Sequence, residues 1–457
     1  MAGRKVFRSE FLEKPQRTMT EPLPRRPSAD LTRDAARNST AVLNADRQRR
    51  IDRIIGPGVC WLLTLFHRLR GSERTHRDVR RILVILLSEM GALVLTRPMF
   101  VRLREKYPSA TVFVLCSDQN RAALDLLEVV AQEQIITVRT DSIGALALDS
   151  ARAVRRLRAL RLDAVLDLEL FARVSAIYAG VCGAVIRVGF HRHTQEGLYR
   201  GNFINRPVPY NPYQHIAQQF VTLADAIDST RVPTVKRLLS ASSPLPKIAL
   251  RSGELEDARE RLHRAHPALA RRPIVFLCPG AGRLPIRAWP LSSFSSVARE
   301  LIARGFAVAI VGLREDRRLA ATIQLACDDA ACVDLTGYTA SVREITVLLH
   351  LGVLLITNDS GTGHFASLTP IPAIVLFGPE TPVLYGSLSP HARNLHKPLS
   401  CSPCLTAYNH RRSPCDGDNV CLKSISPEEV LAAAEDLLGG RMVTAPPLTP
   451  PATSRVR

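Results

Sequence analysis

Aromatic residues are scarce in this 457-residue chain, where Phe, Trp and Tyr together make up 5% of the positions. Proteins that bind single-stranded nucleic acid stack bases on aromatic side chains, and this chain also has no RNP, C2H2 or basic-zipper pattern. The composition therefore argues against a nucleic-acid-binding protein. Hydrophobic residues still account for 46% of the chain, mostly Val, Leu, Ile and Ala. This content supports real hydrophobic cores and excludes a disordered protein.

Long hydrophobic runs are missing as well. Residues 1–46 scatter basic side chains among Pro, Ser, Thr and Glu without an early apolar run, so we expect neither a secretory signal nor a transmembrane helix there. The apolar segment Ile54–Phe66 is too short to span a bilayer and contains Pro57. It is either a helix packed against the first domain or a helix resting on an anionic membrane surface. The second interpretation relies on Trp61, Leu62, Leu65 and Phe66, with arginines before and after them.

Charge is strongly one-sided, with 61 Lys and Arg against 42 Asp and Glu and a formal net charge of +19. Such a chain favours anionic partners, among them nucleotide-sugars, phosphorylated lipid A surfaces and acidic bilayers. Ten cysteines without a secretory signal indicate a reducing compartment rather than a disulfide framework. We therefore expect a cytoplasmic protein, with the inner face of the cytoplasmic membrane as a further location.

Aliphatic runs alternate with helical segments from Arg81 onward, as in a parallel sheet covered on both faces. The stretch Thr230–Leu250, with three prolines and a run of serines, is typical of a connector, and a second alternating set begins at Ile274. We therefore expect two doubly wound α/β domains. The predicted parts are a basic extension with a short apolar segment (1–79), a first domain (80–240), a second domain (241–440) and a Pro-rich disordered tail (441–457).

The stretch Ile356–His364 (ITNDSGTGH) links the end of a predicted strand to a predicted helix. Ligands of doubly wound sheets bind beyond the carboxyl ends of strands, and the N–H groups that open a helix suit a phosphate. We expect Gly361 and Gly363 to present such N–H groups. Asp359 and His364 should face the same crevice, where Asp359 accepts hydrogen bonds from sugar hydroxyls. The alternative is an ordinary turn, since Asp, Ser and Gly commonly follow a strand.

A second glycine-containing loop, Cys278–Gly282 (CPGAG), ends the first strand of the second domain, and Arg287–Pro290 (RAWP) follows. Gly280 and Ala281 would let the backbone approach a diphosphate, while the Arg287 guanidinium would neutralise it. The alternative is a purely structural role, in which Trp289 and Pro290 pack at the start of the following helix.

These segments resemble the donor-site signature of glycosyltransferase family 9, the heptosyltransferase family of bacterial lipopolysaccharide assembly. The resemblance covers about Arg81 to Leu438 and is most specific at Asn358–His364, Phe377–Pro379 and Pro279–Pro290. It implies the GT-B architecture, two doubly wound Rossmann-like domains facing a cleft. It also implies inverting, metal-independent transfer of a sugar, with heptose from ADP-heptose as the expected donor and a lipopolysaccharide core or related lipid-linked glycan as the acceptor.

The resemblance further implies which residues carry the reaction. Arg287 and His364 would stabilise the departing diphosphate. Glu315 or Asp316 would bind the ribose, although one of the two is expected to cap the next helix instead. Relatives usually have Lys at the position of Arg287. The residues expected to bind the donor are Gly280, Ala281, Arg287, Glu315, Thr339, Asp359, Ser360, Gly361, Gly363 and His364.

The catalytic base is where the sequence departs from the family. Ser88–Ala92 resembles the family's opening loop, but Ala92 occupies the position of the Asp that serves as general base. Because alanine takes no proton, we expect Glu89 to be the base, with its pKa raised by desolvation. Asp167 and Glu169, on the acceptor side, are the second choice, and structural hydrogen bonding is the alternative role for both.

Four cysteines near the C-terminus, Cys401, Cys404, Cys415 and Cys421, have the composition of a closed tetrahedral thiolate site. They predict either a structural zinc site or free thiols and redox pairs. Catalysis is expected to need no cofactor.

Two other functions fit the sequence. The loss of the family's Asp at Ala92 suits a catalytically degenerate protein that binds nucleotide-sugars without transferring them. An epimerase of the same architecture would instead act on the free nucleotide-sugar.

Overall fold

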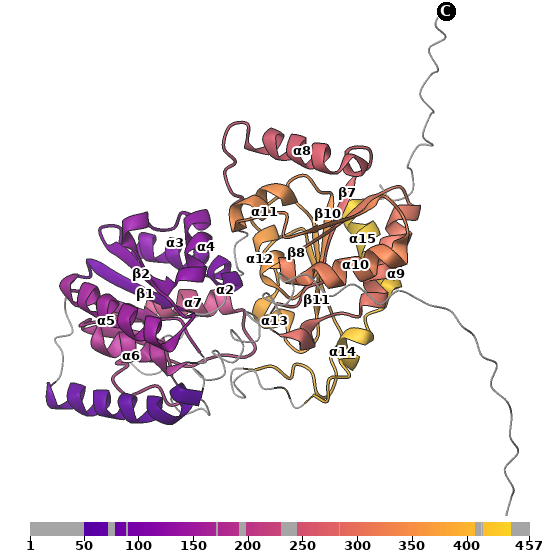
Figure 1. The fold of residues 1–457 in the computed structure, drawn as a ribbon. Coiled ribbons are helices and arrows are strands. Elements are labelled where there is room, and N and C mark those ends of the chain that lie inside the picture. Colours follow the sequence, from indigo (N-terminus) through magenta and orange to yellow (C-terminus); the bar gives the residue numbers. More distant parts are fainter. Residues whose placement is uncertain are drawn as a thin grey trace, which may run out of the picture. The chain divides into compact units, whose positions relative to one another are not determined.

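The computed structural model describes residues 50–71, 78–87, 90–170, 172–191, 198–229, 245–282, 284–406, 413 and 415–439. Within them lie two six-stranded sheets, each with its own covering helices (Figure 1). Most of the predicted connector, from residue 230 to 244, is outside the described residues, as are the tail and most of the basic extension. In the described part of the chain, no helix combines the length and apolar character needed to cross a bilayer.

The first sheet has the strand order β3-β2-β1-β4-β5-β6, and every neighbouring pair is parallel. The crossover between β3 and β4 places the switch point of the sheet between β1 and β4, where both strands end next to each other. Its strands are β1 Arg81–Leu86, β2 Thr111–Ser117, β3 Ile135–Val138, β4 Ala164–Asp167, β5 Ile186–Phe190 and β6 Arg206–Val208. Its helices are α2 Met90–Leu95, α3 Arg97–Lys106, α4 Arg121–Leu127, α5 Ile143–Ala159, α6 Arg173–Val181 and α7 Ile216–Asp225.

The second sheet repeats this plan in the order β12-β11-β10-β7-β8-β9, again fully parallel. Its switch point lies between β7 and β10, the two strands that carry the motifs predicted to bind the donor. Its strands are β7 Ile274–Cys278, β8 Ala307–Gly312, β9 Cys332–Thr336, β10 Leu354–Asn358, β11 Ala373–Phe377 and β12 Ala392–His396. Its helices are α8 Glu254–Ala265, α9 Leu291–Ala303, α10 Arg317–Cys327, α11 Val342–Leu349, α12 Gly361–Ala366, α13 Pro382–Tyr385, α14 Val420–Lys423 and α15 Pro427–Leu438.

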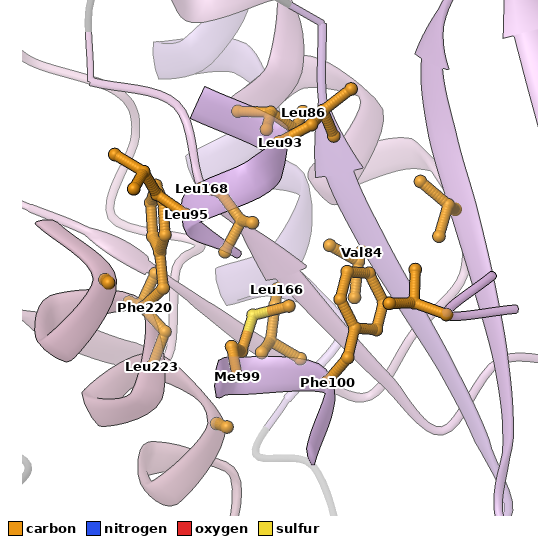
Figure 2. Close-up of a cluster of buried hydrophobic side chains, with 14 of the residues drawn as sticks. Val84, Leu86, Leu93, Leu95, Met99, Phe100, Leu166, Leu168, Phe220 and Leu223 are labelled. Carbon is orange, nitrogen blue, oxygen red and sulfur yellow. The ribbon is translucent and has the colours of Figure 1, made fainter. Parts of the chain in front are cut away.

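Both sheets are buried on two faces, which explains their continuous aliphatic runs. All five residues of β7, β10 and β11 are buried. Figure 2 shows one face of the first sheet, where side chains of β1 and β4 meet those of α2, α3 and α7. Phe100 and Phe220 supply the large surfaces there, and aliphatic side chains fill the remaining space.

Helix α15 illustrates how local sequence sets an element's ends. Ser426 caps its start by accepting a hydrogen bond from the Glu429 N–H, and the Glu429 carboxylate accepts one from the Ser426 N–H at 3.0 Å. Pro427 occupies the first turn, where its missing N–H costs nothing, and Gly439 ends the helix with a φ of +59°. Ser426, Pro427 and Gly439 in the sequence predict a helix over Pro427–Leu438, and the structure confirms both ends.

Residues 50–69 form a helix, and one side of this helix packs against the first domain. Cys60 is fully buried, and Thr64 Oγ1 accepts a hydrogen bond from the Asn202 N–H at 2.9 Å. Asp52 forms an ion pair with Arg173 of α6 at 3.2 Å. The expected packing against the first domain is therefore confirmed for this side of the helix, whereas its opposite side is exposed.

Candidate donor site

Asn358, the last residue of β10, joins the two predicted donor motifs. Its Nδ2 donates a hydrogen bond to the Pro279 carbonyl at 2.8 Å, and its Oδ1 accepts one from the Trp289 N–H at 3.0 Å. Asn358 and Trp289 are buried, so this bridge is shielded from water. The Asn358 side chain therefore holds the loop after β7 against the turn after β10 by two buried hydrogen bonds.

Arg287 extends from this structure to the turn after β10. Its Nη1 lies 3.4 Å from both the carbonyl oxygen and the carboxylate Oδ2 of Asp359, and its Nη2 lies 3.7 Å from Oε1 of Glu380. Its Nε is buried and has no hydrogen-bond partner among the described residues. A guanidinium held by two carboxyl groups with one N–H unused is suited to bind an additional anion.

Glu380, three residues beyond the end of β11, was missed by the sequence reasoning. It is 3% exposed, and burial raises its pKa to about 8, an effect that Asp359 reinforces and Arg287 opposes. Burial also raises the pKa of Asp359, while Arg287 lowers it. The contact between the two carboxyl groups raises the pKa of Glu380 and lowers that of Asp359. The available signal was an acidic residue directly after Gly378-Pro379 at the end of a strand adjacent to β10.

His364 lies near Arg287 and beside the first domain. Burial lowers its pKa to about 4, with smaller contributions in the same direction from the nearby His215 and Arg287. The imidazole is therefore neutral at neutral pH, so it can stabilise a departing diphosphate by donating an N–H but not by positive charge. A Cβ at Gly91 would lie 2.8 Å from His364 Cδ2, which places the start of α2 directly against α12.

The helix expected after this turn is shorter than an ordinary helix. α12 has six residues, so its macrodipole is small and its opening N–H groups act mainly as individual donors. Ser360 is its N-cap residue, and Ser360 Oγ lies 3.0 Å from Thr357 Oγ1. At Gly363 a Cβ would point toward Thr357 and Val375 of the sheet. The absence of a side chain at Gly363 therefore serves packing on the sheet, and the role predicted for its backbone N–H stays a prediction.

Gly280 also lies against a neighbouring side chain, and its predicted approach to a diphosphate stays a prediction. A Cβ there would lie 2.7 Å from the carboxylate of Asp316, and one at Gly312 would lie equally close. Asp316 Oδ2 accepts a hydrogen bond from the Leu313 N–H at 2.9 Å, which closes the turn Arg314–Asp316. Asp316 occupies the N-cap position of α10, but its side chain makes no capping hydrogen bond to that helix. Glu315 beside it is exposed and remains the candidate for the ribose. The predicted donor residues Ala281 and Thr339 are both partly buried.

Asp167 and Glu169, the second-choice bases, are engaged in the first domain. Asp167 is 1% exposed and forms an ion pair with Arg200, which also donates a hydrogen bond to Ser175 Oγ at 2.8 Å. Glu169 Oε1 accepts a hydrogen bond from the Leu87 N–H at 2.7 Å. Glu169 thus ties the end of β4 to the residue before the Ser88–Glu89 segment. Ser88 and Glu89 themselves lie outside the described residues, and the assignment of Glu89 as base stays a prediction.

The four C-terminal cysteines lie within electrostatic reach of one another. Burial raises the pKa of Cys421, and Cys404, Cys415 and Cys401 add to the rise because thiolates repel one another. Across the described ranges, however, no three His, Cys, Asp or Glu side chains are arranged to hold a metal ion. The thiols have the right composition for zinc but not the coordination geometry, so zinc stays a prediction.

The chain has two doubly wound parallel sheets with the same kind of crossover in each, and candidate ligand groups lie at the switch point of the second sheet. This architecture is the GT-B class of glycosyltransferase folds. The comparisons with known proteins agree. The profile of glycosyltransferase family 9 (heptosyltransferase) matches residues 150–412. The chain belongs to this family and is a glycosyltransferase.

Three relatives illustrate the similarity. Lipooligosaccharide heptosyltransferase 2 of Haemophilus ducreyi is 26% identical over 318 residues, which are 68% of this chain and 87% of the relative. The structure of the Escherichia coli ADP-heptose lipopolysaccharide heptosyltransferase II is 23% identical, with a TM-score of 0.61 over 78% of this chain and 98% of that one. A family 9 glycosyltransferase from Veillonella parvula is 20% identical, with a TM-score of 0.63 over 79% and 98%. These structural likenesses show the fold.

Proposed function

We propose that this protein transfers heptose from ADP-heptose to a hydroxyl of a lipopolysaccharide core or related lipid-linked glycan, with inversion at the anomeric carbon. The observation that carries the proposal is Arg287, whose guanidinium reaches the turn after β10 with a buried, unused N–H. Such a group fits the diphosphate of a nucleotide-sugar. The names of the relatives support heptose and ADP as the sugar and nucleotide.

In the proposed reaction the acceptor oxygen attacks the anomeric carbon of heptose. The new C–O bond forms as the bond to the diphosphate breaks, and ADP departs with the electron pair. The acceptor's proton passes to the base, for which we propose Glu89. Charge develops on the departing diphosphate, where Arg287 and the opening N–H groups of α12 stabilise it. Neutral His364 supports them by donating an N–H.

The raised pKa of Glu380 explains how Asp359 and Glu380 can both lie beside an anionic ligand. A protonated Glu380 carries no charge, and Asp359 is compensated by Arg287, so the group of three is close to neutral. We propose that Asp359 accepts hydrogen bonds from heptose or ribose hydroxyls. The proton on Glu380 holds the Asp359 carboxylate in place, which makes Glu380 a positioning residue.

The direct test is transfer by the purified full-length chain supplied with ADP-heptose and a deacylated lipopolysaccharide acceptor. Mass spectrometry should detect the acceptor enlarged by one heptose together with ADP. The Glu89→Gln variant should lose about 100-fold or more in kcat, the contribution expected of a general base. Glu133→Gln, at an exposed position in the first domain, serves as the matched control and should keep wild-type turnover.

Three results would redirect the proposal. Binding of ADP-heptose without transfer to any acceptor would indicate the degenerate binding protein. Conversion of the free nucleotide-sugar without an acceptor would indicate an epimerase. A Glu89→Gln variant as active as Glu133→Gln would leave the transferase in place but refute the base.

Zinc is proposed as a structural ion at the four C-terminal cysteines, with no part in catalysis. Metal analysis of freshly purified protein should find about one zinc per chain. A chelator should then lower the melting temperature without changing the initial rate of transfer. Fewer than about one zinc in ten chains would contradict the site and leave four free thiols.

A lipid-linked acceptor and a cytoplasmic nucleotide-sugar would meet at the inner face of the cytoplasmic membrane. We propose that the protein acts there as a peripheral protein.

A further inference from the structure

The outer side of helix 50–69 carries an unusual concentration of exposed apolar surface. Half of the exposed large hydrophobic side chains in the described part of the chain lie on this one helix. Leu69 is 79% exposed, Ile54 69%, and Trp61 and Leu62 each 58%. We call this the outer face, formed by Ile51, Ile54, Ile55, Trp61, Leu62, Leu65, Phe66 and Leu69.

The outer face is one continuous stripe. At about 100° per residue its eight side chains fall within an arc of roughly 140°, while Cys60 and Thr64 lie outside that arc and face the first domain. The helix cannot turn to bury the stripe because its inner side is fixed. His67 Nε2 lies 2.9 Å from the Gly180 carbonyl, and Asp52 is held by Arg173. The fold therefore holds this apolar stripe outward.

The charges around the outer face are all of one sign. Arg50, Arg53, Arg68 and Arg70 are exposed at the two ends of the helix. Asp52 is the one acid between residues 50 and 71, and its charge is compensated by Arg173. An apolar stripe with cationic ends is complementary to a surface whose outer layer is anionic and whose interior is apolar.

We propose that the outer face docks the protein onto an anionic lipid bilayer. The aliphatic side chains and Trp61 would enter the boundary between headgroups and acyl chains, and the flanking Arg50, Arg68 and Arg70 would contact anionic headgroups. The proposal does not depend on the proposed sugar transfer, since vesicle binding is measured without donor or acceptor.

The chain carries its own reporter for this docking. It has two tryptophans: Trp61 is 58% exposed on the outer face, and Trp289 is 1% exposed in the core of the second domain. Vesicles of phosphatidylcholine with phosphatidylglycerol should shift the emission of the full-length protein to shorter wavelength, and brominated acyl chains should quench it. Pure phosphatidylcholine vesicles should do neither, because the cationic ends then have no partner.

Variants separate the two contributions. Leu62→Glu with Leu65→Glu should weaken flotation with anionic vesicles by about tenfold or more, because both side chains would enter the interface. Replacing the three flanking arginines by Gln should weaken binding by about fivefold per arginine and remove most of its salt dependence. Leu325→Glu is the matched control, since Leu325 is 83% exposed on α10 of the second domain, and it should bind as the wild type does.

The variants must also stay folded, which an unchanged melting temperature and unchanged transfer to a soluble acceptor would establish. Unchanged vesicle binding of the Leu62→Glu, Leu65→Glu variant would overturn the proposal. So would the absence of wild-type binding to anionic vesicles. In that case light scattering tests the other occupant: a dimer that the double variant abolishes would identify a second copy of the chain.

Discussion

Replacing Arg287 with Met is expected to lower kcat/KM for sugar transfer by about 100- to 1000-fold, the loss seen when one group that stabilises a developing anion is removed. Arg287 is the cation placed against Asp359 and Glu380, and its buried Nε has no hydrogen-bond partner among the described residues. The fold should survive, because the Arg287 guanidinium lies 3.4 Å from Asp359 and 3.7 Å from Glu380, contacts too long to contribute much to stability.

Two further variants make this experiment specific. Arg287→Lys keeps the charge but loses the fork of donors that holds both acids, so its activity should fall between those of wild type and Arg287→Met. Arg299→Met, at an exposed position on α9, is the matched control for removing an arginine from the second domain. An Arg287→Met variant with more than half of the wild-type kcat/KM would contradict the proposed donor site.

Replacing Arg200 with Met is expected to destabilise the first domain by about 3–5 kcal/mol, because it leaves the Asp167 carboxylate buried without its counter-ion. Arg200 is 2% exposed and Asp167 1% exposed, and Arg200 also holds Ser175 and the Glu169 carbonyl. Thermal unfolding should show a clearly lower melting temperature.

A second substitution tests the cause. Adding Asp167→Leu to Arg200→Met removes the uncompensated charge and should recover a large part of the lost stability. The control is Arg80→Met, which breaks an ion pair whose side chains are 74% and 76% exposed and should change little. If Arg200→Met and Arg80→Met melt alike, the buried pair does not have the role described.

The sequence predicted the strands well because nearly all of them are buried on both faces. The apolar runs Ile82–Leu87, Ile274–Cys278 and Ala373–Phe377 each predict a strand. The structure has these strands at Arg81–Leu86, Ile274–Cys278 and Ala373–Phe377. Elements with weaker patterns were missed, among them α2, α4, α8 and the edge strand β12, whose residues are mostly half-buried or exposed. Edge strands and short helices receive much of their stability from tertiary contacts, which periodicity does not report.

The candidate site was predictable where a motif sits at the end of a strand. The convergence of Arg287 on the turn after β10 followed from the rule that ligands of doubly wound sheets bind at switch points. The reasons for individual glycines were not predictable. Gly280 accommodates Asp316 and Gly91 accommodates His364, residues 36 or more positions away in the chain. Glu380 joined the site through pairing of β10 with β11, a neighbour relation that one sequence does not specify.

The central claim is that the turn after β10 and the Arg287 guanidinium hold the same diphosphate. A crystal structure of the full-length protein with ADP tests this most directly. We expect the diphosphate oxygens within hydrogen-bond distance of the Arg287 guanidinium and of backbone N–H groups at the start of α12. A diphosphate bound elsewhere on the protein, or contacted by only one of these two groups, would contradict the account.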